Sequence, residues 1–205
     1  MCNLYEHNVA YSQFLDTFSD LRIPLVFPTP AAAPNLEPRE IRPTDPASVI
    51  RARDEGVELV QLKWGFAPGA PKRPPVTNFR SEGRSFGPRR CLIPASAFFE
   101  FTGAKYPKTR WRFTEAGQDW FCMAGLWRPV EGDWLESFTL LTCAPGEDVR
   151  PYHDRQVIVL DRARWAEWLD PASDSATLLQ PSPPGALRVE AARRATQPPP
   201  GPMLL

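Results

Sequence analysis

Residues 120–127 read Trp120-Phe121-Cys122-Met123-Ala124-Gly125-Leu126-Trp127, a continuous apolar run of strand length. Other segments before and after it are also apolar or alternate between apolar and polar residues, and turn-forming residues separate them. These segments are residues 48–52, 57–64, 90–94, 97–101, 110–114, 137–143 and 157–160. Because the strands are short and numerous, we expect a strongly twisted, mixed or antiparallel sheet that forms a barrel-like core.

A few helices should flank this sheet. Residues 9–21 place apolar side chains mostly at three- and four-residue steps, which is typical of a short amphipathic helix. Asp161 is a suitable cap for a second helix, which would bury Trp165 and Trp168 and end at Pro171. The predicted fold class is therefore α+β in a single domain.

Length and proline content set the domain organisation that we expect. The chain has 205 residues, which one domain with one large core accommodates, and its 25 prolines predict short elements and many turns. Residues 23–46 and 67–77 are proline-rich and are expected to be loops. We assign residues 1–180 to the catalytic domain and residues 181–205 to a proline-rich C-terminal tail.

The charge pattern bears on partners and location. The formal net charge is +0, so binding to nucleic acid requires a local basic patch rather than a global field. Of 24 Lys and Arg residues only four are Lys, and Arg favours bidentate contacts with phosphate or carboxylate. No apolar run approaches a membrane span, and the N-terminus lacks the basic and apolar regions of a signal peptide. We therefore expect a cytoplasmic protein with no membrane partner.

The cysteines do not form a metal or disulfide framework. The four are Cys2, Cys91, Cys122 and Cys143. They include no CxxC pair, and the two histidines, His7 and His153, do not complete a zinc pattern, so no metal or other cofactor is expected. The last three cysteines lie among apolar residues, which predicts core packing of reduced thiols.

Cys2 is the residue with the most distinctive chemistry. A small residue after the initiator allows methionine aminopeptidase to remove Met1, which leaves Cys2 with both a free α-amine and a thiol. These groups have ordinary pKa values of about 7.7–8.0 and about 8.5, so both are partly reactive at neutral pH. The amine can attack a carbonyl to form a Schiff base, and the thiol can then close a thiazolidine ring. The alternative is that Cys2 merely follows the start codon.

Three polar residues stand out against apolar surroundings. Asn78 lies between a proline-rich segment and Arg80, where it would hold a catalytic group or simply form a turn. Glu100 interrupts an aromatic run, where a raised pKa would suit a proton shuttle; alternatively, it faces solvent from the outer side of a strand. His153 precedes an apolar strand and is either an acid–base group or a surface histidine held by Asp154.

The order and spacing of these residues resemble a known family. The matching segments are Met1-Cys2 and residues 64–69, 74–82, 90–94, 98–101, 124–127 and 153–155. Together they resemble the SRAP family, the SOS response-associated peptidases, which includes bacterial and vertebrate sensors of abasic sites in DNA. Each motif alone is weak, but the ordered set is specific and covers residues 1 to about 169.

The resemblance implies a role for each matched residue. Cys2 would bond covalently to the ring-opened aldehyde of an abasic deoxyribose in single-stranded DNA. Asn78 would hold the N-terminal amine or the sugar oxygen, and Glu100 would relay protons. His153 would act as an acid–base group or hydrogen-bond the sugar or phosphate. The protein would be a monomer that associates with the nucleoid when it binds DNA.

A further set of residues is expected to contact DNA. It comprises Arg80, Arg84, Trp64, Lys72, Arg73 and Arg90. The sequence departs from the family at Ala70-Pro71, where many members carry bulky aromatic residues that stack on bases. Since stacking contributes roughly 1–3 kcal/mol per base, weaker DNA binding or an altered junction preference is expected.

The same residues also fit a hydrolase, a lyase or a binding module. A cysteine-type peptidase or amidase would use the Cys2 thiol on an amide bond, and self-catalysed removal of Met1 would be compatible with either activity. A lyase-type activity would follow from the same Schiff-base chemistry. The last alternative is a binding module without covalent chemistry.

Overall fold

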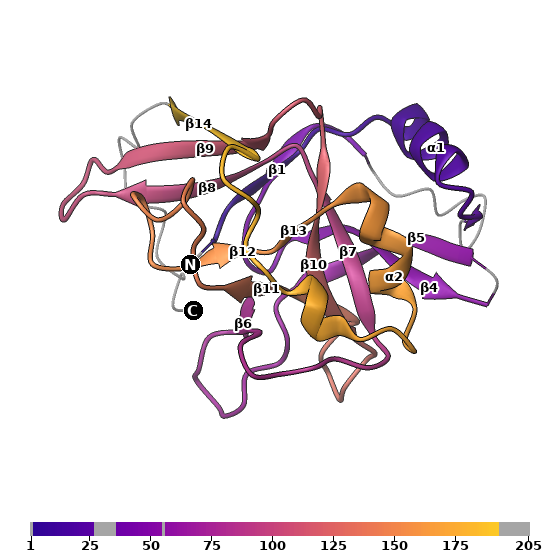
Figure 1. Cartoon of the computed structure of the whole chain (residues 1–205). Coiled ribbons are helices and arrows are strands. Elements are labelled where there is room, and N and C mark those ends of the chain that lie inside the picture. The colour runs from indigo at the N-terminus through magenta and orange to yellow at the C-terminus, as the bar shows by residue number, and fades with distance from the viewer. Residues whose placement is uncertain (1, 27–35, 55, 193–205) are drawn as a thin grey trace.

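The computed structural model describes residues 2–26, 36–54 and 56–192, and its largest feature is a sheet that closes on itself (Figure 1). Five strands form the ring: β11 (Ser137–Cys143), β10 (Phe121–Arg128), β7 (Arg90–Ala95), β4 (Pro46–Arg53) and β5 (Gly56–Trp64). Neighbours in this order are antiparallel, and β5 and β11 close the ring in parallel, with Phe138 opposite Trp64. The barrel-like core predicted from the strand pattern is confirmed.

Four short strands extend this sheet. They are β2 (Leu25–Val26), β6 (Asn78–Arg80), β12 (Gln156–Val157) and β13 (Val159–Leu160). Strand β6 runs parallel to β11, so that Asn78 lies opposite Leu140. Strand β12 pairs with the far end of β11, where Cys143 lies opposite Gln156. One strand therefore aligns the segment that begins with Asn78 and the segment that follows His153.

The smaller sheet has five strands and packs beside the ring, at the upper left of Figure 1. Its order is β14 (Leu187–Ala192), β9 (Thr109–Glu115), β8 (Ala97–Thr102), β1 (Tyr5–His7) and β3 (Arg39–Ile41). Only Ser96 separates β7 from β8, so one nearly continuous segment belongs to both sheets. Because β1 pairs with β8, Tyr5 lies opposite Phe98 and the preceding residues are carried against β8.

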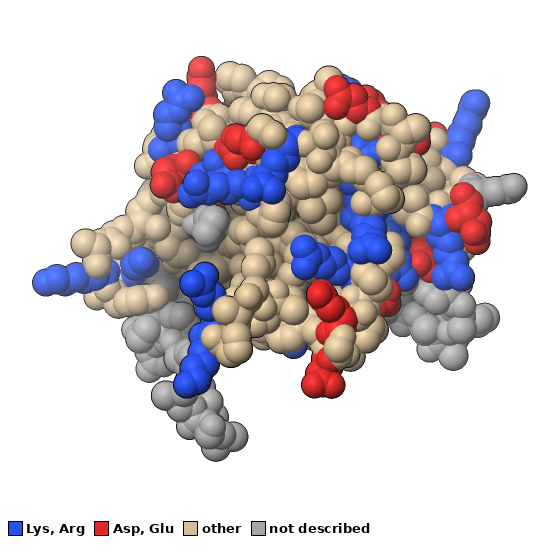
Figure 2. Space-filling model, turned by 90° about the horizontal axis from the view of Figure 1, so that it is seen from below, with Lys and Arg blue, Asp and Glu red and all other residues tan. Residues whose placement is uncertain are grey.

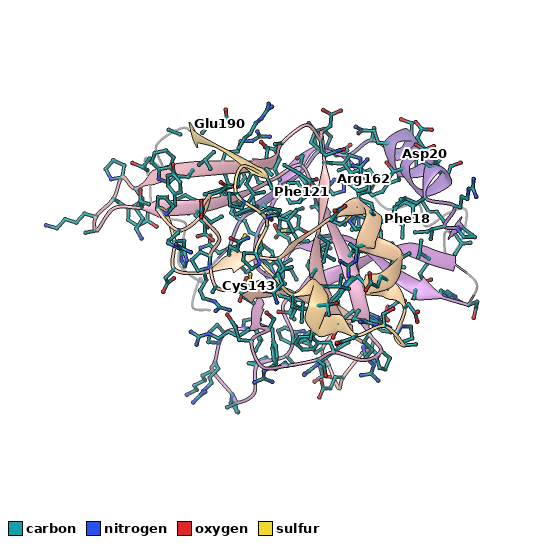
Figure 3. All side chains as sticks on the ribbon, in the orientation of Figure 1. Phe18, Asp20, Phe121, Cys143, Arg162 and Glu190 are labelled. Carbon is teal, nitrogen blue, oxygen red and sulfur yellow. The ribbon has the colours of Figure 1, made fainter. Side chains whose placement is uncertain are left out.

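Short helices cover the right side of the molecule. They are α1 (Tyr11–Asp20), α2 (Trp165–Leu169) and two 3-10 turns, η2 (Arg162–Arg164) and η3 (Ser175–Leu178). Helix α1 buries Phe18 against Trp165, and both rings belong to the core over β4 and β5 (Figure 3). Asp161 accepts a hydrogen bond from the N–H of Ala163, which confirms its capping position. No helix in the described ranges is long and apolar enough to cross a membrane.

The apolar core explains why residues 120–127 are continuously apolar. Phe121 and Met123 are fully buried in one cluster between the sheets, and Cys122 and Ala124 are fully buried in the cluster under the helices. A strand buried on both faces is continuously apolar, as this one is. Cys91, Cys122 and Cys143 are buried free thiols, so their predicted core packing is confirmed.

Three segments differ from the prediction. Residues 23–46 were expected to be loop, but β2 and β3 form there because each adds to an available strand, β5 and β1 respectively. The segment 157–160 was expected to be one strand and is instead divided between β12 and β13, which pair with different neighbours. Residues 187–192, within the expected tail, form β14 along β9, and residues 193–205 lie outside the described residues.

Candidate functional site

The first half of the site joins Cys2 to Asn78. The Asn78 Nδ2 group donates a hydrogen bond to the carbonyl oxygen of Cys2 over 2.8 Å and another to Thr77 Oγ1 over 3.2 Å. Asn78 Oδ1 is buried and has no hydrogen-bond partner among the described residues, so it can accept a hydrogen bond from a ligand or a terminal amine. Cys2 is only 1% exposed, and its thiol donates to the carbonyl of Leu4 over 3.3 Å.

The second half joins Glu100 to His153. Glu100 Oε2 lies 3.8 Å from His153 Nε2. Glu100 is 3% exposed, so the alternative in which it faces solvent is excluded. Strand β8 is covered on both faces, because Phe99 packs with Leu4 on the face opposite Glu100. Burial raises the pKa of Glu100 to about 7, which leaves it able to give and take a proton near neutral pH.

The imidazole of His153 is held from its other nitrogen. The backbone N–H of Arg155 donates to His153 Nδ1 over 2.9 Å, which places the ring proton on Nε2, toward Glu100. Partial burial lowers the pKa of His153, so the neutral ring is favoured at neutral pH. The carboxylate of Asp154, which is 90% exposed, also lies 2.9 Å from Nδ1.

The thiol of Cys2 differs from the expectation for a free cysteine. Burial, reinforced by the nearby negative charge of Glu100, raises its pKa to about 12. The thiol is therefore protonated at neutral pH, and the prediction of a partly ionised thiol is wrong for this environment. Since the thiolate is the nucleophile, a neighbouring base must accept its proton during any reaction.

Strand pairing brings these four residues together from distant parts of the chain. Cys2 precedes β1, which pairs with β8 and its Glu100, and the Phe99 N–H donates to the carbonyl of Leu4 over 3.1 Å. Asn78 begins β6, and His153 lies three residues before β12; both strands pair with β11. The structure thus places all four predicted catalytic residues in one site.

The predicted DNA contacts divide into exposed and buried residues. Lys72, Arg73, Arg80 and Arg84 are exposed, and the Arg84 guanidinium lies 4.9 Å from the centre of the Phe79 ring. Figure 2 shows Lys and Arg side chains at several separate places on the underside of the molecule, with acidic groups among them. Any attraction to a nucleic-acid backbone must therefore come from local groups.

Two predicted DNA contacts are buried instead. Trp64 is fully buried between Tyr5 and Phe138, and its indole N–H donates to the carbonyl of Thr77 over 2.9 Å. It cannot stack on a base, but it holds the residue that precedes Asn78. Arg90 is 3% exposed and donates to the backbone carbonyls of Asp170 and Ser173, so its guanidinium is directed into the protein and not toward DNA.

Other residues, for which no role was predicted, also border the site. The Arg155 guanidinium pairs with both carboxylate oxygens of Glu82, and the rings of Trp111 and Tyr152 lie 4.6 Å apart. Trp111 lies opposite Glu100 in the pairing of β8 with β9. Glu82 and Arg155 fall within the motifs that carried the family resemblance, and this was the only signal for them.

A separate cleft of about 560 Å³ lies beside the site. It is lined by Ser81, Glu82, Gly83, Arg84, Ser85, Cys143, Ala144, Ala176, Leu179, Gln180 and Pro181. None of the four candidate catalytic residues lines it, so this cleft is a neighbour of the candidate site and not the site itself. Among the residues described, no group of three His, Cys, Asp or Glu side chains could hold a metal ion.

The fold and the site define a class of small β-rich proteins in which a cysteine, an asparagine, a glutamate and a histidine form one cluster. A family model described as SOS response associated peptidase (SRAP) matches residues 1–196. The chain belongs to this family.

Individual relatives agree with that assignment. The abasic site processing protein YobE of Bacillus subtilis is 27% identical over 197 residues, which cover 88% of this chain and 87% of the relative. The abasic site processing protein YedK of Escherichia coli is 31% identical over 139 residues, 63% of each chain. A crystal structure of a Bordetella bronchiseptica protein matches with a TM-score of 0.73 and 25% identity, covering 94% of this chain and 100% of that one.

Proposed function

We propose that this protein processes abasic sites in DNA by forming a covalent thiazolidine link between Cys2 and the abasic sugar in single-stranded DNA. The observation that carries the proposal is the convergence of buried Cys2 and Glu100 with half-buried Asn78 and His153 in one cluster. Aldehyde capture needs an amine, a thiol and a proton shuttle held together, and such positioning is a large part of catalysis. Relatives named as abasic site processing proteins support the same substrate.

The proposed reaction begins with the open form of the sugar. Once Met1 has been removed, protonated Glu100 gives its proton to the ring oxygen while the hemiacetal hydroxyl loses its proton to water. The bond between C1′ and the ring oxygen breaks, which exposes the C1′ aldehyde. The Cys2 amine attacks that carbon and one water leaves, so that a Schiff base forms. The pKa of Glu100, raised by burial to about 7, suits this donation near neutral pH.

The second step closes the ring. The Cys2 thiol adds to the imine carbon, and its proton passes to the imine nitrogen by way of the Glu100 carboxylate. Because burial and Glu100 raise the pKa of this thiol to about 12, transfer to a neighbouring base must accompany the attack. The net change is one aldehyde, one amine and one thiol converted to one thiazolidine and one water.

The other residues position the reactants. The Asn78 side chain fixes the carbonyl of Cys2, and its buried Oδ1 would accept a hydrogen bond from the Cys2 amine or a sugar hydroxyl. His153 Nε2 would assist the proton transfer at Glu100. Exposed Arg80 and Arg84 would hold phosphates, which makes binding largely indifferent to base sequence.

A gel assay tests the proposal. The purified protein is mixed with a single-stranded oligonucleotide that carries one abasic site, and the products are separated under denaturing conditions. A shifted band should form with the wild-type protein and be absent both for Cys2→Ala and for an oligonucleotide without the lesion. No shifted band with wild-type protein lacking Met1 would overturn the proposal.

A cysteine-type peptidase or amidase is the second candidate, because the family description names a peptidase. The buried thiol with its raised pKa disfavours a free thiolate, so Glu100 would have to serve as the base for attack on an amide. In this reading Cys2 turns over a peptide, or removes Met1 from its own chain, without forming a band with DNA. A lyase-type activity would instead release a cleaved DNA strand from the Schiff base.

A further inference from the structure

The ion pair between Arg155 and Glu82 connects two segments of the site. The guanidinium of Arg155 donates to both carboxylate oxygens of Glu82, over 2.9 Å for the Nη2–Oε2 contact. The same guanidinium donates to the carbonyl oxygen of Thr142 over 2.8 Å and to its hydroxyl over 3.0 Å. Bidentate, charge-assisted hydrogen bonds of this kind fix the orientation of both partners.

Both partners are joined directly to catalytic segments. Glu82 follows β6, which carries Asn78, and Ser81 next to it donates to the carbonyl of Thr142 over 3.0 Å. Arg155 is two residues from His153, and its backbone N–H donates to the imidazole Nδ1. The side chain and the backbone of Arg155 therefore link the segment that follows Asn78 to the ring of His153.

The ring of His153 can take either of two tautomers at this position. With Arg155 N–H donating to Nδ1, the proton lies on Nε2 and points toward Glu100. The exposed carboxylate of Asp154, 2.9 Å from the same nitrogen, instead favours a proton on Nδ1, which would turn a bare Nε2 toward Glu100. Asp154 is exposed, so solvent weakens its attraction, whereas four acceptor oxygens of Glu82 and Thr142 hold the Arg155 guanidinium in place.

We propose that Glu82 is a positioning residue that selects the His153 tautomer. Glu82 anchors the Arg155 side chain against Thr142, the anchored arginine keeps its backbone N–H on Nδ1, and the ring presents an Nε2–H to Glu100. Only the expected effect on crosslinking rests on the proposed function; the effect on the ring does not.

Nitrogen-15 NMR of the full chain tests the effect on the ring. The protein has only two histidines, and His7 is buried with a pKa lowered by burial to about 4, so the His153 signals can be identified as those that disappear in a His153→Ala variant. At pH 7.5 the wild-type spectrum should show an unprotonated Nδ1 and a protonated Nε2. Glu82→Ala should move a large share of the signal to the opposite tautomer, and Arg155→Lys, which loses the bidentate geometry, should shift it the same way.

A matched control removes a similar ion pair elsewhere. Glu167 forms a pair with Arg164 in which two nitrogen contacts reach the carboxylate, and the exposed fraction of Glu167 (37%) is similar to that of Glu82 (46%). Glu167→Ala should leave the His153 signals unchanged. An unchanged tautomer in both Glu82→Ala and Arg155→Lys, with a native circular dichroism spectrum, would overturn the inference.

The rate of crosslinking gives a second test of the role of Glu82. Displacement of a catalytic group by a fraction of an ångström to one ångström costs up to about a hundredfold in rate, so we expect a loss of about tenfold for Glu82→Ala and none for Glu167→Ala. An equal loss in both variants, or none in Glu82→Ala, would contradict a positioning role. If the wild-type protein formed no crosslink, the proposed function would fail, but the NMR result would still decide the role of Glu82.

Discussion

Burial changes the acid–base behaviour of the ionisable side chains around Cys2. It raises the pKa of the Cys2 thiol to about 12 and that of Glu100 to about 7, while it lowers the pKa of His153. All three shifts favour the uncharged form, as expected for groups removed from water. At neutral pH the thiol and the imidazole are thus uncharged, and Glu100, with a pKa of about 7, can both give and take a proton.

The titration of Glu100 predicts a specific dependence of stability on pH. Its pKa rises from 4.5 to about 7 on folding, so its contribution to stability is complete below pH 4.5 and is lost as the pH rises through 7. Between those values the free energy of unfolding of the wild type should fall relative to Glu100→Gln by roughly 3 kcal/mol. Urea unfolding at a series of pH values measures this difference, and a difference that does not change with pH would contradict the raised pKa.

The same substitution tests the proton shuttle. Glu100→Gln cannot donate to the sugar oxygen or accept the thiol proton, and general acid–base catalysis typically contributes about 10²- to 10⁴-fold. We expect crosslinking to slow by a factor in that range while the circular dichroism spectrum stays native. An unchanged rate would remove Glu100 from the mechanism.

For single residues, the sequence predicted the candidate catalytic set but not which side chains are buried. Cys2, Asn78, Glu100 and His153 were identified because ordered family motifs singled them out, and the structure brings them together. The sequence could not show that Trp64 and Arg90 are buried, because their partners Tyr5, Phe138 and Asp170 are distant in the chain. Nor could it show the thiol pKa, which depends on packing around the side chain.

Strand β10 is tightly packed between its two neighbours at Gly125. A side chain at Gly125 would approach the Cδ1 atom of Ile93 within 2.1 Å and the backbone oxygen of Thr139 within 2.8 Å, because β7 and β11 flank the strand. This close approach gives a physical reason for glycine in the Ala124–Trp127 motif. A backbone oxygen cannot move aside as a flexible side chain can.

Gly125→Ala should therefore lower the free energy of unfolding by about 1–3 kcal/mol, as overpacking of a core does. Gly87→Ala is the matched control, since nothing lies within 4 Å of a side chain added there. Both variants can be compared by urea denaturation. Equal stability of the two variants would show that the ring of strands is looser around β10 than the structure indicates.

Apolar patterning predicted the long strands but not the short ones. Strands such as β5, β10 and β11 are apolar enough to be visible in the sequence, because each buries one or both faces. Strand β2 has only two residues, β3 and β14 carry mixed residues, and all three form by adding to an existing strand. Edge pairing is a tertiary effect, so local pattern alone does not reveal it.

For the whole molecule, a net charge of +0 restricts how DNA can be attracted. Binding would depend on a few exposed cations, chiefly Arg80 and Arg84, rather than on a general positive field. Each phosphate contact with single-stranded DNA adds about 0.7 to the slope of log affinity against log salt.

We therefore expect binding of single-stranded DNA to weaken as salt rises, and each of Arg80→Ala and Arg84→Ala to lower that slope by roughly 0.7. The control is Arg90→Lys, which removes no exposed cation and should leave the slope unchanged. Fluorescence anisotropy at several salt concentrations gives the slopes. A salt response as steep in both arginine variants as in the wild type would place the phosphate contacts elsewhere.

The most direct measurement of the central claim is the intact mass of the protein–DNA adduct, formed without any reducing agent. The account predicts the mass of the chain lacking Met1 plus the abasic oligonucleotide minus one water, with Cys2 carrying the link in the N-terminal peptide. An adduct that retains Met1, that appears only after borohydride reduction, or that maps to a lysine would contradict it.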